Sequence, residues 1–480
     1  MNATAEDIYN VIVIGAGTAG LVTAAGTAGL GGRAALIERN LMGGDCLNFG
    51  CVPSKALISS ARLIQQIRNA EKWGLDRQSP RFAFENVFDR MRARRAKIAP
   101  NDSQERFESL GVDVFRGEGC FVSPHEIEVN GQKLRARDFV IATGSRPTIP
   151  KIEGIDSVRY FTNETIFDEL KEKPERMIVL GGGPIGCELG QAFQRLGVRV
   201  TILQSVAQIL PAEDVDVAKF MQDRFTIEGM ELRLQTVAKG ISQRDGRIVV
   251  QLEKGEPLTG DAILVAAGRT PNLRALNLKA AGVDHDEHGV KVNAYLQTSQ
   301  PHIYAAGDVT NRLKFTHTAD FTARIVVRNI LLPFQFLRAK VDWSVVPWCT
   351  YTDPEVAHVG LGEKEAKQKH VEYDLFTVPL EDIDRAVVES ECAGFAKILI
   401  AKGSDKILGA IIVAPHAGDL LHEFVLAMKA GVGLGTIAST IHAYPTLAEL
   451  ARKAGDKYNK TRLTPRVQKI FSWLYERARK

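Results

Sequence analysis

The chain has 480 residues, of which 45% are hydrophobic and 25% charged, so it is long enough for two to four domains with buried cores. Its formal net charge is only +4 and no basic run is interleaved with aromatic residues, which argues against nucleic-acid binding. The N-terminal residues lack a secretory pattern, and no apolar run reaches the roughly 20 residues of a membrane span. Six cysteines are too few for a secreted disulfide scaffold. We therefore expect an ordinary globular protein of the cytoplasm.

The first nucleotide-binding signal lies close to the N-terminus. Residues 8–20, IYNVIVIGAGTAG, form an apolar run that ends in Gly15-x-Gly17-x-x-Gly20 and continues into an alanine-rich stretch. This order predicts a strand, a tight turn and a helix whose N-terminal end accepts a pyrophosphate. Glu38 closes the next apolar stretch, and an acid there suits the free hydroxyls of an adenosine ribose, as in FAD or NAD.

The same pattern returns 166 residues later as MIVLGGGPIG, with Gly181, Gly183 and Gly186 as its glycines. One chain is thus predicted to carry two dinucleotide-binding units, although the second glycine cluster alone is also compatible with a simple tight turn. The offset places Gln204 where the first unit has Glu38. Gln204 has no charge to repel a 2′-phosphate and no arginine directly after it to bind one, so the second unit is predicted to take NADH or NADPH.

Three further apolar stretches end in small residues and glycine, as expected where a backbone packs against a large flat cofactor. Their candidate cofactor-contacting residues are Thr143, Gly144, Gly268 and Asp308. The chain leaves the first unit near residue 150, completes a second unit and returns to a nucleotide-contacting strand near residue 303. This order predicts one domain inserted in another.

The pattern changes near residue 346, where several apolar runs are typical of antiparallel strands and are followed by a predicted helix over 418–430. We interpret this part as a separate α+β domain. The last stretch, residues 465–480, places Val467, Ile470, Phe471 and Leu474 on one side of a basic amphipathic helix. Such a helix packs on its own protein or dimer partner, or binds a membrane surface or another protein.

Two cysteines lie five positions apart in GGDCLNFGCVPSK, residues 43–55. The chain has no cysteine pair at CxxC spacing that could complete a structural zinc site with Cys46 and Cys51. A purely structural disulfide across so short a loop would stabilise the fold by only about 2 kcal/mol. Pro53 suits the first turn of a helix that begins at about Cys51, where the helix dipole favours a thiolate. A reversible, redox-active disulfide therefore fits this stretch better than a metal-binding site or a structural disulfide.

Together, the cysteine stretch, the two glycine patterns and AAGD at 305–308 resemble the pyridine nucleotide-disulfide oxidoreductases, over residues 8 to about 455. This family includes dihydrolipoamide dehydrogenase, glutathione reductase and mercuric reductase. The resemblance implies an α/β fold with two Rossmann-like dinucleotide-binding domains, the second inserted in the first, and a C-terminal α+β dimerisation domain. The implied boundaries are an FAD-binding domain at 1–150 and 276–345, an NAD(P)H-binding domain at 151–275, a dimerisation domain at 346–464 and the tail at 465–480.

The resemblance also implies a relay in which a reduced nicotinamide passes a hydride to FAD, and FAD passes electrons to a Cys46–Cys51 disulfide. By matched position, Cys51 is the thiolate at the flavin and Cys46 the exchange thiol that faces the substrate. Lys55 is implied to lie near the flavin ring, with Glu188 meeting both this lysine and the nicotinamide. Gly44 belongs to the same cofactor-binding stretch.

In this family the C-terminal domain forms a homodimer, and its loop completes the partner's active site. Dihydrolipoamide dehydrogenase and glutathione reductase place a histidine and a glutamate there, whereas this chain has Tyr444 in the histidine position, with Glu449 after it. A phenol titrates near ~10 and is a poor proton shuttle at neutral pH. Alternatively, Tyr444 only packs at an interface, or His442 serves as the acid.

Tyr444 favours an oxidoreductase that resembles mercuric reductase and acts on a thiol-reactive acceptor. The chain departs from mercuric reductase in one respect: Cys392 is its last cysteine, so the C-terminal cysteine pair is absent. One alternative is a dihydrolipoamide dehydrogenase acting on protein-bound lipoyl groups. A second is a slow flavin and disulfide sensor that docks through its basic tail.

Overall fold

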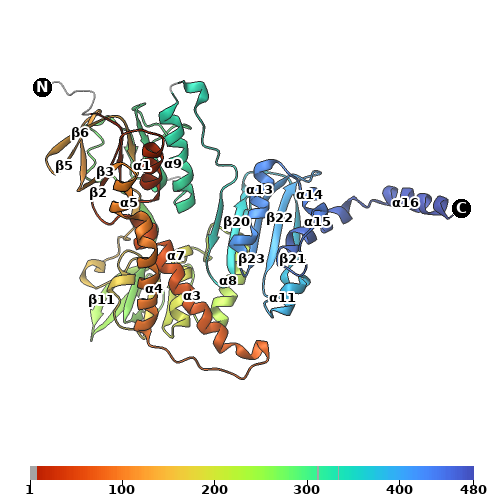
Figure 1. Ribbon diagram of the computed structural model, residues 1–480. Coiled ribbons are helices and arrows are strands. Elements are labelled where there is room, and N and C mark those ends of the chain that lie inside the picture. Colours follow the sequence, from red (N-terminus) through yellow and green to blue (C-terminus); the bar gives the residue numbers. More distant parts are fainter. Residues whose placement is uncertain (1–7, 311–312, 333, 480) are drawn as a thin grey trace. The chain divides into compact units, whose positions relative to one another are not determined.

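The computed structural model describes residues 8–310, 313–332 and 334–479. The described chain forms two compact units. The first consists of residues up to 61, 81–207 and 229–342, and the second of residues 62–80, 208–228 and 343 onward. Figure 1 shows the elements of both units along the chain.

The first unit is built around a seven-stranded sheet with the order β3-β2-β1-β6-β5-β4 and β18 beside β6. Strands β1, β2, β3, β6 and β18 run parallel to one another, and β4 and β5 are antiparallel. Near-continuous apolar runs such as β2 are buried along their whole length, as expected for parallel strands covered on both faces. The strands are β1 (Ile8–Ile14), β2 (Ala34–Glu38), β3 (Val112–Arg116), β4 (Gly119–Ser123), β5 (Glu126–Val129), β6 (Gln132–Ile141) and β18 (Ile303–Ala305).

Helix α1 packs on this sheet, and α7 packs on the separate sheet that contains β8 (Arg176–Leu180) and β9 (Arg199–Leu203). Helix α1 packs against α9, and Gly26 makes room for Val327 between them, because a Cβ on Gly26 would lie 3.1 Å from that side chain. The helices of this unit are α1 (Thr18–Gly29), α2 (Gly44–Asn48), α3 (Cys51–Arg68), α4 (Phe84–Ile98), α5 (Gln104–Ser109), α6 (Ile166–Glu169), α7 (Pro184–Arg195) and α9 (Thr316–Leu331). Helix α3 continues past residue 61 into the second unit.

Within the first unit, the inserted segment that carries the second glycine pattern has its own parallel sheet, with the order β10-β9-β8-β14. Helix α7 repeats α1 with the offset of 166 residues that the sequence predicts. The strands are β8 (Arg176–Leu180), β9 (Arg199–Leu203), β10 (Glu231–Arg233) and β14 (Ala262–Val265). Smaller antiparallel sheets are formed by β11 (Ala238–Arg244), β12 (Arg247–Leu252) and β13 (Leu258–Gly260), by β7 (Ser145–Pro147) and β15 (Arg269–Pro271), and by β16 (His285–Asp286) and β17 (Gly289–Val290).

The second unit is an antiparallel five-stranded sheet with the order β19-β20-β23-β22-β21. The strands are β19 (Pro347–Thr350), β20 (Glu355–Gly360), β21 (Tyr373–Pro379), β22 (Phe395–Ala401) and β23 (Ile407–Ala414). The helices are α8 (Val215–Ile227), α10 (Glu363–Gln368), α11 (Asp384–Val388), α12 (Ala417–Leu420), α13 (His422–Ala430), α14 (Leu434–Ser439), α15 (Glu449–Arg462) and α16 (Pro465–Ala478). The single helix expected over 418–430 is thus two helices, α12 and α13, separated at Leu421.

Buried charge fixes the segment 208–228 within the second unit. Lys397 Nζ lies 2.8 Å from Asp214 Oδ2, 2.9 Å from Asp216 Oδ1 and 2.8 Å from Glu363 Oε2. Three carboxylates therefore compensate one buried ammonium group, and the segment before α8 is tied to β22 and α10. The sequence analysis includes segment 208–228 in the NAD(P)H-binding domain expected at 151–275. The domain boundaries given there stay a prediction.

The fold class expected from the sequence is confirmed: the structure has two glycine-turn α/β units, the second inserted in the first, and a C-terminal α+β part. Within the described ranges, the helices lack the combination of length and apolar character that crossing a bilayer requires.

Candidate active site

The cysteine stretch begins where two glycines bring it against the first glycine turn. Gly43 and Gly44 have φ of +87° and +58°, in the left-handed region that disfavours other residues. A Cβ on Gly44 would lie 2.6 Å from the Cα of Gly17. These glycines therefore allow the start of α2 to touch the loop that precedes α1.

The two cysteines lie on consecutive helices, Cys46 in the middle of the short α2 and Cys51 at the start of α3. Cys46 is half-buried on α2, and Cys51 is exposed as the first residue of α3, so the predicted helix start at Cys51 is confirmed. Both are free cysteines whose side chains share a hydrogen bond. The Cys51 Sγ also lies 3.4 Å from the hydroxyl oxygen of Thr316, at the start of α9.

The surroundings of the pair favour one thiolate, on Cys51. The hydrogen bond with Cys46 lowers the pKa of Cys51 to about 6, and the positive charge of Lys55 and the Thr316 hydroxyl act in the same direction. The same hydrogen bond, together with burial, raises the pKa of Cys46. The position of Cys51 at the N-terminus of α3 is independent support, because a helix dipole stabilises a thiolate there. The pair is therefore arranged as a thiolate and a thiol that donates to it.

Lys55 and Glu188 form an ion pair that joins α3 to α7, the helix of the second glycine turn. Lys55 Nζ lies 2.8 Å from Glu188 Oε2, with Lys55 one helical turn beyond Cys51 and Glu188 buried on α7. Lys55 follows Cys51 by four residues on α3, and its positive charge lowers the pKa of Cys51. The structure thus brings together the four polar residues that the sequence selects for this part of the site.

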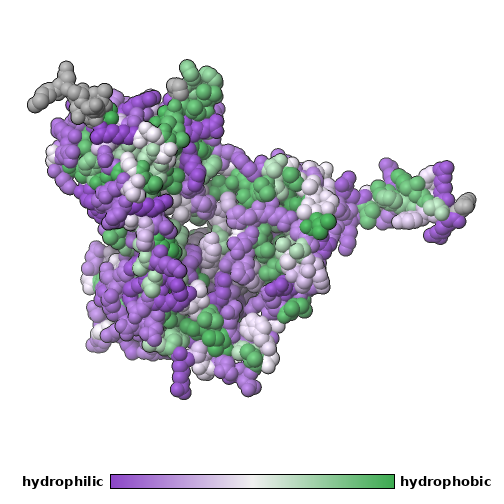
Figure 2. Space-filling view, in the orientation of Figure 1, coloured by the Kyte–Doolittle hydropathy of each residue, from purple (hydrophilic) through white to green (hydrophobic). Residues whose placement is uncertain are grey.

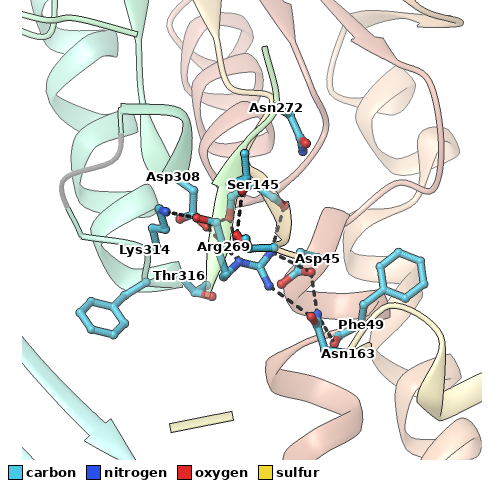
Figure 3. A network of polar contacts seen from close by, with 12 residues as sticks. Asp45, Phe49, Ser145, Asn163, Arg269, Asn272, Asp308, Lys314 and Thr316 are labelled. Atoms are coloured by element: carbon cyan, nitrogen blue, oxygen red, sulfur yellow. Dashed lines mark hydrogen bonds and ion pairs between the residues drawn. The ribbon is translucent and has the colours of Figure 1, made fainter. Parts of the chain in front are cut away.

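A second polar network includes Asp45, which precedes Cys46 in the chain (Figure 3). Ser145 donates to Asp308 at 2.6 Å, and Arg269 donates through Nε to the Ser145 hydroxyl at 2.8 Å. Burial raises the pKa of Asp308. The other end of the guanidinium contacts Asp45, the neighbour of Cys46, at 3.1 Å. Arg269 therefore connects the end of β18 with the helix that carries Cys46.

The sequence analysis missed several of these groups. It selected Gly268 and passed over Arg269, the next residue, whose signal was an arginine directly after the apolar stretch AILVAAG at 262–268. It also missed Asn163, which donates to Asp45 and to the Phe49 carbonyl, both at 3.1 Å. Thr316 had no signal near the cysteines, since 265 positions separate it from Cys51.

The first glycine turn has the shape and polarity that an FAD pyrophosphate and ribose require. Gly15 has φ of +104°, and a Cβ there would lie 2.5 Å from the Ala142 carbonyl oxygen. A Cβ on Gly20 would lie 1.7 Å from the Gly15 oxygen, so α1 starts directly against the turn. Glu38 is buried at the end of β2 and accepts from the Ala16 N–H at 2.6 Å. The first turn of α1 has no acidic side chain to oppose an anion.

Other predicted cofactor contacts follow β6 and β14. The Thr143 hydroxyl donates to the Asn272 carbonyl at 2.7 Å, and the Asn272 N–H donates to the Gly144 carbonyl at 3.0 Å. Gly268 has φ of +110° just before β15. These residues and Asp308 belong to the same unit as the first glycine turn, so the residues present fit a bound FAD.

The second glycine turn reproduces the first in detail. Cβ atoms on Gly181 and Gly186 would lie 2.4 Å from the Ala266 oxygen and 1.9 Å from the Gly181 oxygen, whereas nothing lies within 4 Å of one on Gly183. Buried Gln204 accepts from the Gly182 N–H at 3.2 Å, which is the equivalent of the Glu38 contact with Ala16. The uncharged amide of Gln204 thus takes the position that the Glu38 carboxylate has at the first glycine turn. The second turn fits a nicotinamide dinucleotide.

The predicted site residues of the C-terminal loop, Tyr444 and Glu449, each contact another residue of the same chain. The Tyr444 hydroxyl donates to Asp384 Oδ2 at 3.0 Å, and this contact raises the pKa of the exposed phenol. Buried Glu449 accepts from Arg452 at 2.9 Å. The alternative acid, His442, is held by Glu423 at 3.0 Å and by the Thr440 carbonyl at 3.0 Å.

Comparison with known proteins agrees with this geometry. Residues 9–323 match the family model described as pyridine nucleotide-disulphide oxidoreductase, and residues 346–454 match its dimerisation domain. The chain is 33% identical to a mercuric reductase of Staphylococcus aureus, over 94% of the chain and 83% of that protein. It is 35% identical to a dihydrolipoyl dehydrogenase of Chlamydia trachomatis serovar D, over 93% of the chain and 96% of that protein.

A solved structure resembles the model closely. The Cu(II) complex of the HOCl-induced flavoprotein disulfide reductase RclA from Escherichia coli superimposes with a TM-score of 0.83 at 27% identity. The alignment covers 92% of this chain and 98% of RclA. Members of the matched family use FAD and NAD(P)H. The chain is therefore an oxidoreductase, and it belongs to the pyridine nucleotide-disulphide oxidoreductase family.

Proposed function

We propose that two copies of this chain form an NAD(P)H-dependent flavoprotein that reduces a soft, thiol-reactive metal cation at Cys46 and Cys51. Bound FAD would accept a hydride from the nicotinamide and deliver two electrons to the sulfur pair. The residues that would hold FAD are Gly15, Gly17, Gly20, Glu38, Gly44, Lys55, Thr143, Gly144, Gly268 and Asp308, and those for the nicotinamide are Gly181, Gly183, Gly186, Glu188 and Gln204.

The observation that carries the proposal is the split between the two thiols. The pKa of Cys51 is lowered to about 6 by the hydrogen bond with Cys46, with Lys55 adding to the effect. Cys51 is therefore a thiolate at neutral pH, while Cys46 keeps its proton and is the thiol that meets the acceptor. Thiolate and thiol ligands bind soft cations in preference to hard ones. Reduction of Hg(II) to the metal consumes two electrons, which one NAD(P)H supplies with the release of one proton.

The loop around Tyr444 favours a metal cation over a disulfide as acceptor. Thiol–disulfide exchange needs a group that gives and takes a proton as each thiolate leaves. The contact with Asp384 raises the pKa of Tyr444, so its phenol keeps its proton at neutral pH. A soft cation needs no such shuttle. In the proposed dimer, Tyr444 and Glu449 of one subunit would complete the site that holds Cys46 of the other.

Two of the comparisons mention a metal. One is a mercuric reductase and the other, RclA, was solved as a Cu(II) complex. A protein-bound lipoyl group is the second candidate acceptor, because identity to the dihydrolipoyl dehydrogenase is equally high, at 35%. A reducing compartment such as the cytoplasm would keep the exchange thiol active.

Steady-state turnover tests the proposal directly. NADH and NADPH oxidation should be measured with Hg(II) plus excess thiol, with lipoamide and with glutathione disulfide. We expect turnover with Hg(II) that Cys46→Ser and Cys51→Ser abolish, while Cys120→Ser, which changes a half-buried cysteine on β4, retains it. Faster turnover of lipoamide than of Hg(II) would select the second candidate. No turnover with any acceptor would refute the proposed activity.

A further inference from the structure

Helix α16 leaves its apolar side chains uncovered. None of its residues from Pro465 to Ala478 is buried. Ile470, Phe471 and Leu474 are 57%, 49% and 45% exposed, and Trp473 is 55% exposed. Figures 1 and 2 show α16 standing away from the sheet of the second unit, with hydrophobic residues along it.

The sequence orders these side chains around the helix. At the 3.6 residues per turn of an α-helix, the apolar residues fall within an arc of about 100°. They are Val467, Ile470, Phe471, Leu474 and Ala478. Tyr475 extends the arc on one side. The Thr464 side chain caps the helix by accepting from the Val467 N–H, so the stretch has its own start signal.

Positive charge borders the apolar arc on both sides. Arg466 and Arg477 lie next to Ile470 on one side, and Arg479 lies on the opposite side beyond Tyr475. Lys469 adds a further positive charge, and Glu476 is the single acid of residues 465–479. The guanidinium of Arg477 lies 5.5 Å from the centre of the Trp473 ring, at the edge of the arc.

This charge pattern decides between two kinds of occupant. A second copy of α16 would place arginines and lysines against the same residues of its partner, with one glutamate per helix to offset them. An anionic lipid surface complements the pattern instead. Its acyl region takes the apolar arc, its headgroups pair with the bordering cations, and the indole and phenol rings lie at the interface between the two.

We propose that α16 lies flat on membrane surfaces that carry anionic headgroups, with Ile470, Phe471 and Leu474 inserted, and so recruits the enzyme to them. The proposal is separate from the proposed acceptor, since α16 carries no residue of the candidate active site. Binding depends on both contributions. Each bordering cation strengthens it by about fivefold, and the inserted side chains supply the remainder.

Flotation of the purified full-length chain with vesicles tests the proposal. Vesicles of phosphatidylcholine alone are compared with vesicles containing about one quarter phosphatidylglycerol. We expect binding to the anionic vesicles, weakened at least about tenfold by Phe471→Ser with Leu474→Ser and, separately, by Arg466→Gln with Arg477→Gln. The emission of Trp473, taken as the difference from Trp473→Phe, should shift to shorter wavelength with the anionic vesicles.

Matched control variants change the same chemistry elsewhere. Ile227→Ser removes a side chain that is 78% exposed on α8, and Arg94→Gln with Lys97→Gln removes two exposed charges from α4. Both controls should bind vesicles like the wild type, and NAD(P)H oxidation in solution should be unchanged in every α16 variant.

Three results would overturn the proposal. The first is an absence of wild-type binding to anionic vesicles, and the second is equal binding by wild type and α16 variants. The third is a change of oligomeric state in the Phe471→Ser, Leu474→Ser variant, measured by light scattering, because that would assign α16 to the subunit interface.

Discussion

The contact between Thr316 and Cys51 gives a quantitative prediction. Their side-chain oxygen and sulfur lie 3.4 Å apart, and the hydroxyl contributes to the lowering of the Cys51 pKa to about 6. Thr316→Val removes the hydroxyl at nearly constant volume. The thiolate then loses one donor while Cys46 and Lys55 remain in place, so we expect the pKa of Cys51 to rise.

The size of the shift follows from the contact. A hydrogen bond to a buried charge contributes about 1.5–3 kcal/mol. Cys51 is exposed, so solvent screening reduces the contribution to about 0.5–1 kcal/mol. At about 1.4 kcal/mol per unit, the pKa rises by about 0.4–0.7 units, and the thiolate fraction at pH 6 falls from about one half to about one quarter.

Alkylation of the reduced protein measures this shift. Only the thiolate reacts with iodoacetamide, so the rate at Cys51, followed by peptide mass spectrometry, should rise with pH through about 6 and level off above about 7 in the wild type. The midpoint should move upward in Thr316→Val and stay in place in Thr316→Ser, which keeps the hydroxyl. An unchanged midpoint in the valine variant, or an equal shift in both variants, would refute the role of this hydroxyl.

Three further predictions concern the ion pairs and the second glycine turn. Lys55→Met should raise the pKa of Cys51 because it removes a positive charge, and should lower the unfolding free energy by about 2 kcal/mol because it breaks the ion pair with buried Glu188. Alkylation and urea unfolding check the two effects, and unchanged values of both would contradict the assignment. Arg269→Ala should lower the free energy of unfolding by about 2–3 kcal/mol, whereas Arg159→Ala, which breaks the exposed pair with Glu169, should lower it by less than about 1 kcal/mol in the same urea experiment. Equal losses would count against the network of Figure 3. Gln204→Glu should lower kcat/KM for NADPH by about tenfold relative to NADH, because a carboxylate repels a 2′-phosphate; an unchanged ratio would place the adenosine ribose away from this residue.

Local patterns predicted the parts of the molecule that local chemistry determines. The offset of 166 residues between the glycine turns reappears as equivalent turns, helices and backbone contacts of Glu38 and Gln204. The start of α3 at Cys51 follows from the proline and glycines around it. Both depend on residues close together in the chain, for which sequence spacing translates directly into geometry.

Contacts between residues far apart in the chain could not be predicted from the sequence. Thr316 and Arg269 reach Cys51 and Asp45 only because separate strands and helices of one unit converge at the cysteines, and neither lies in a motif that refers to its partner. Tyr444 shows the same limit. Its place in a known pattern said nothing of the partner of its hydroxyl, which is Asp384, 60 positions earlier in the chain.

Anaerobic two-electron reduction of the flavoprotein tests the central claim most directly, namely that Cys51 is the thiolate at the flavin and Cys46 the exchange thiol. The wild type should gain two reactive thiols and a long-wavelength absorption band from the thiolate beside the flavin. Cys46→Ser should keep a thiolate, and with it such a band, whereas Cys51→Ser should lack the band at every pH. A band of wild-type intensity in Cys51→Ser, or no gain of reactive thiols in the wild type, would contradict the account.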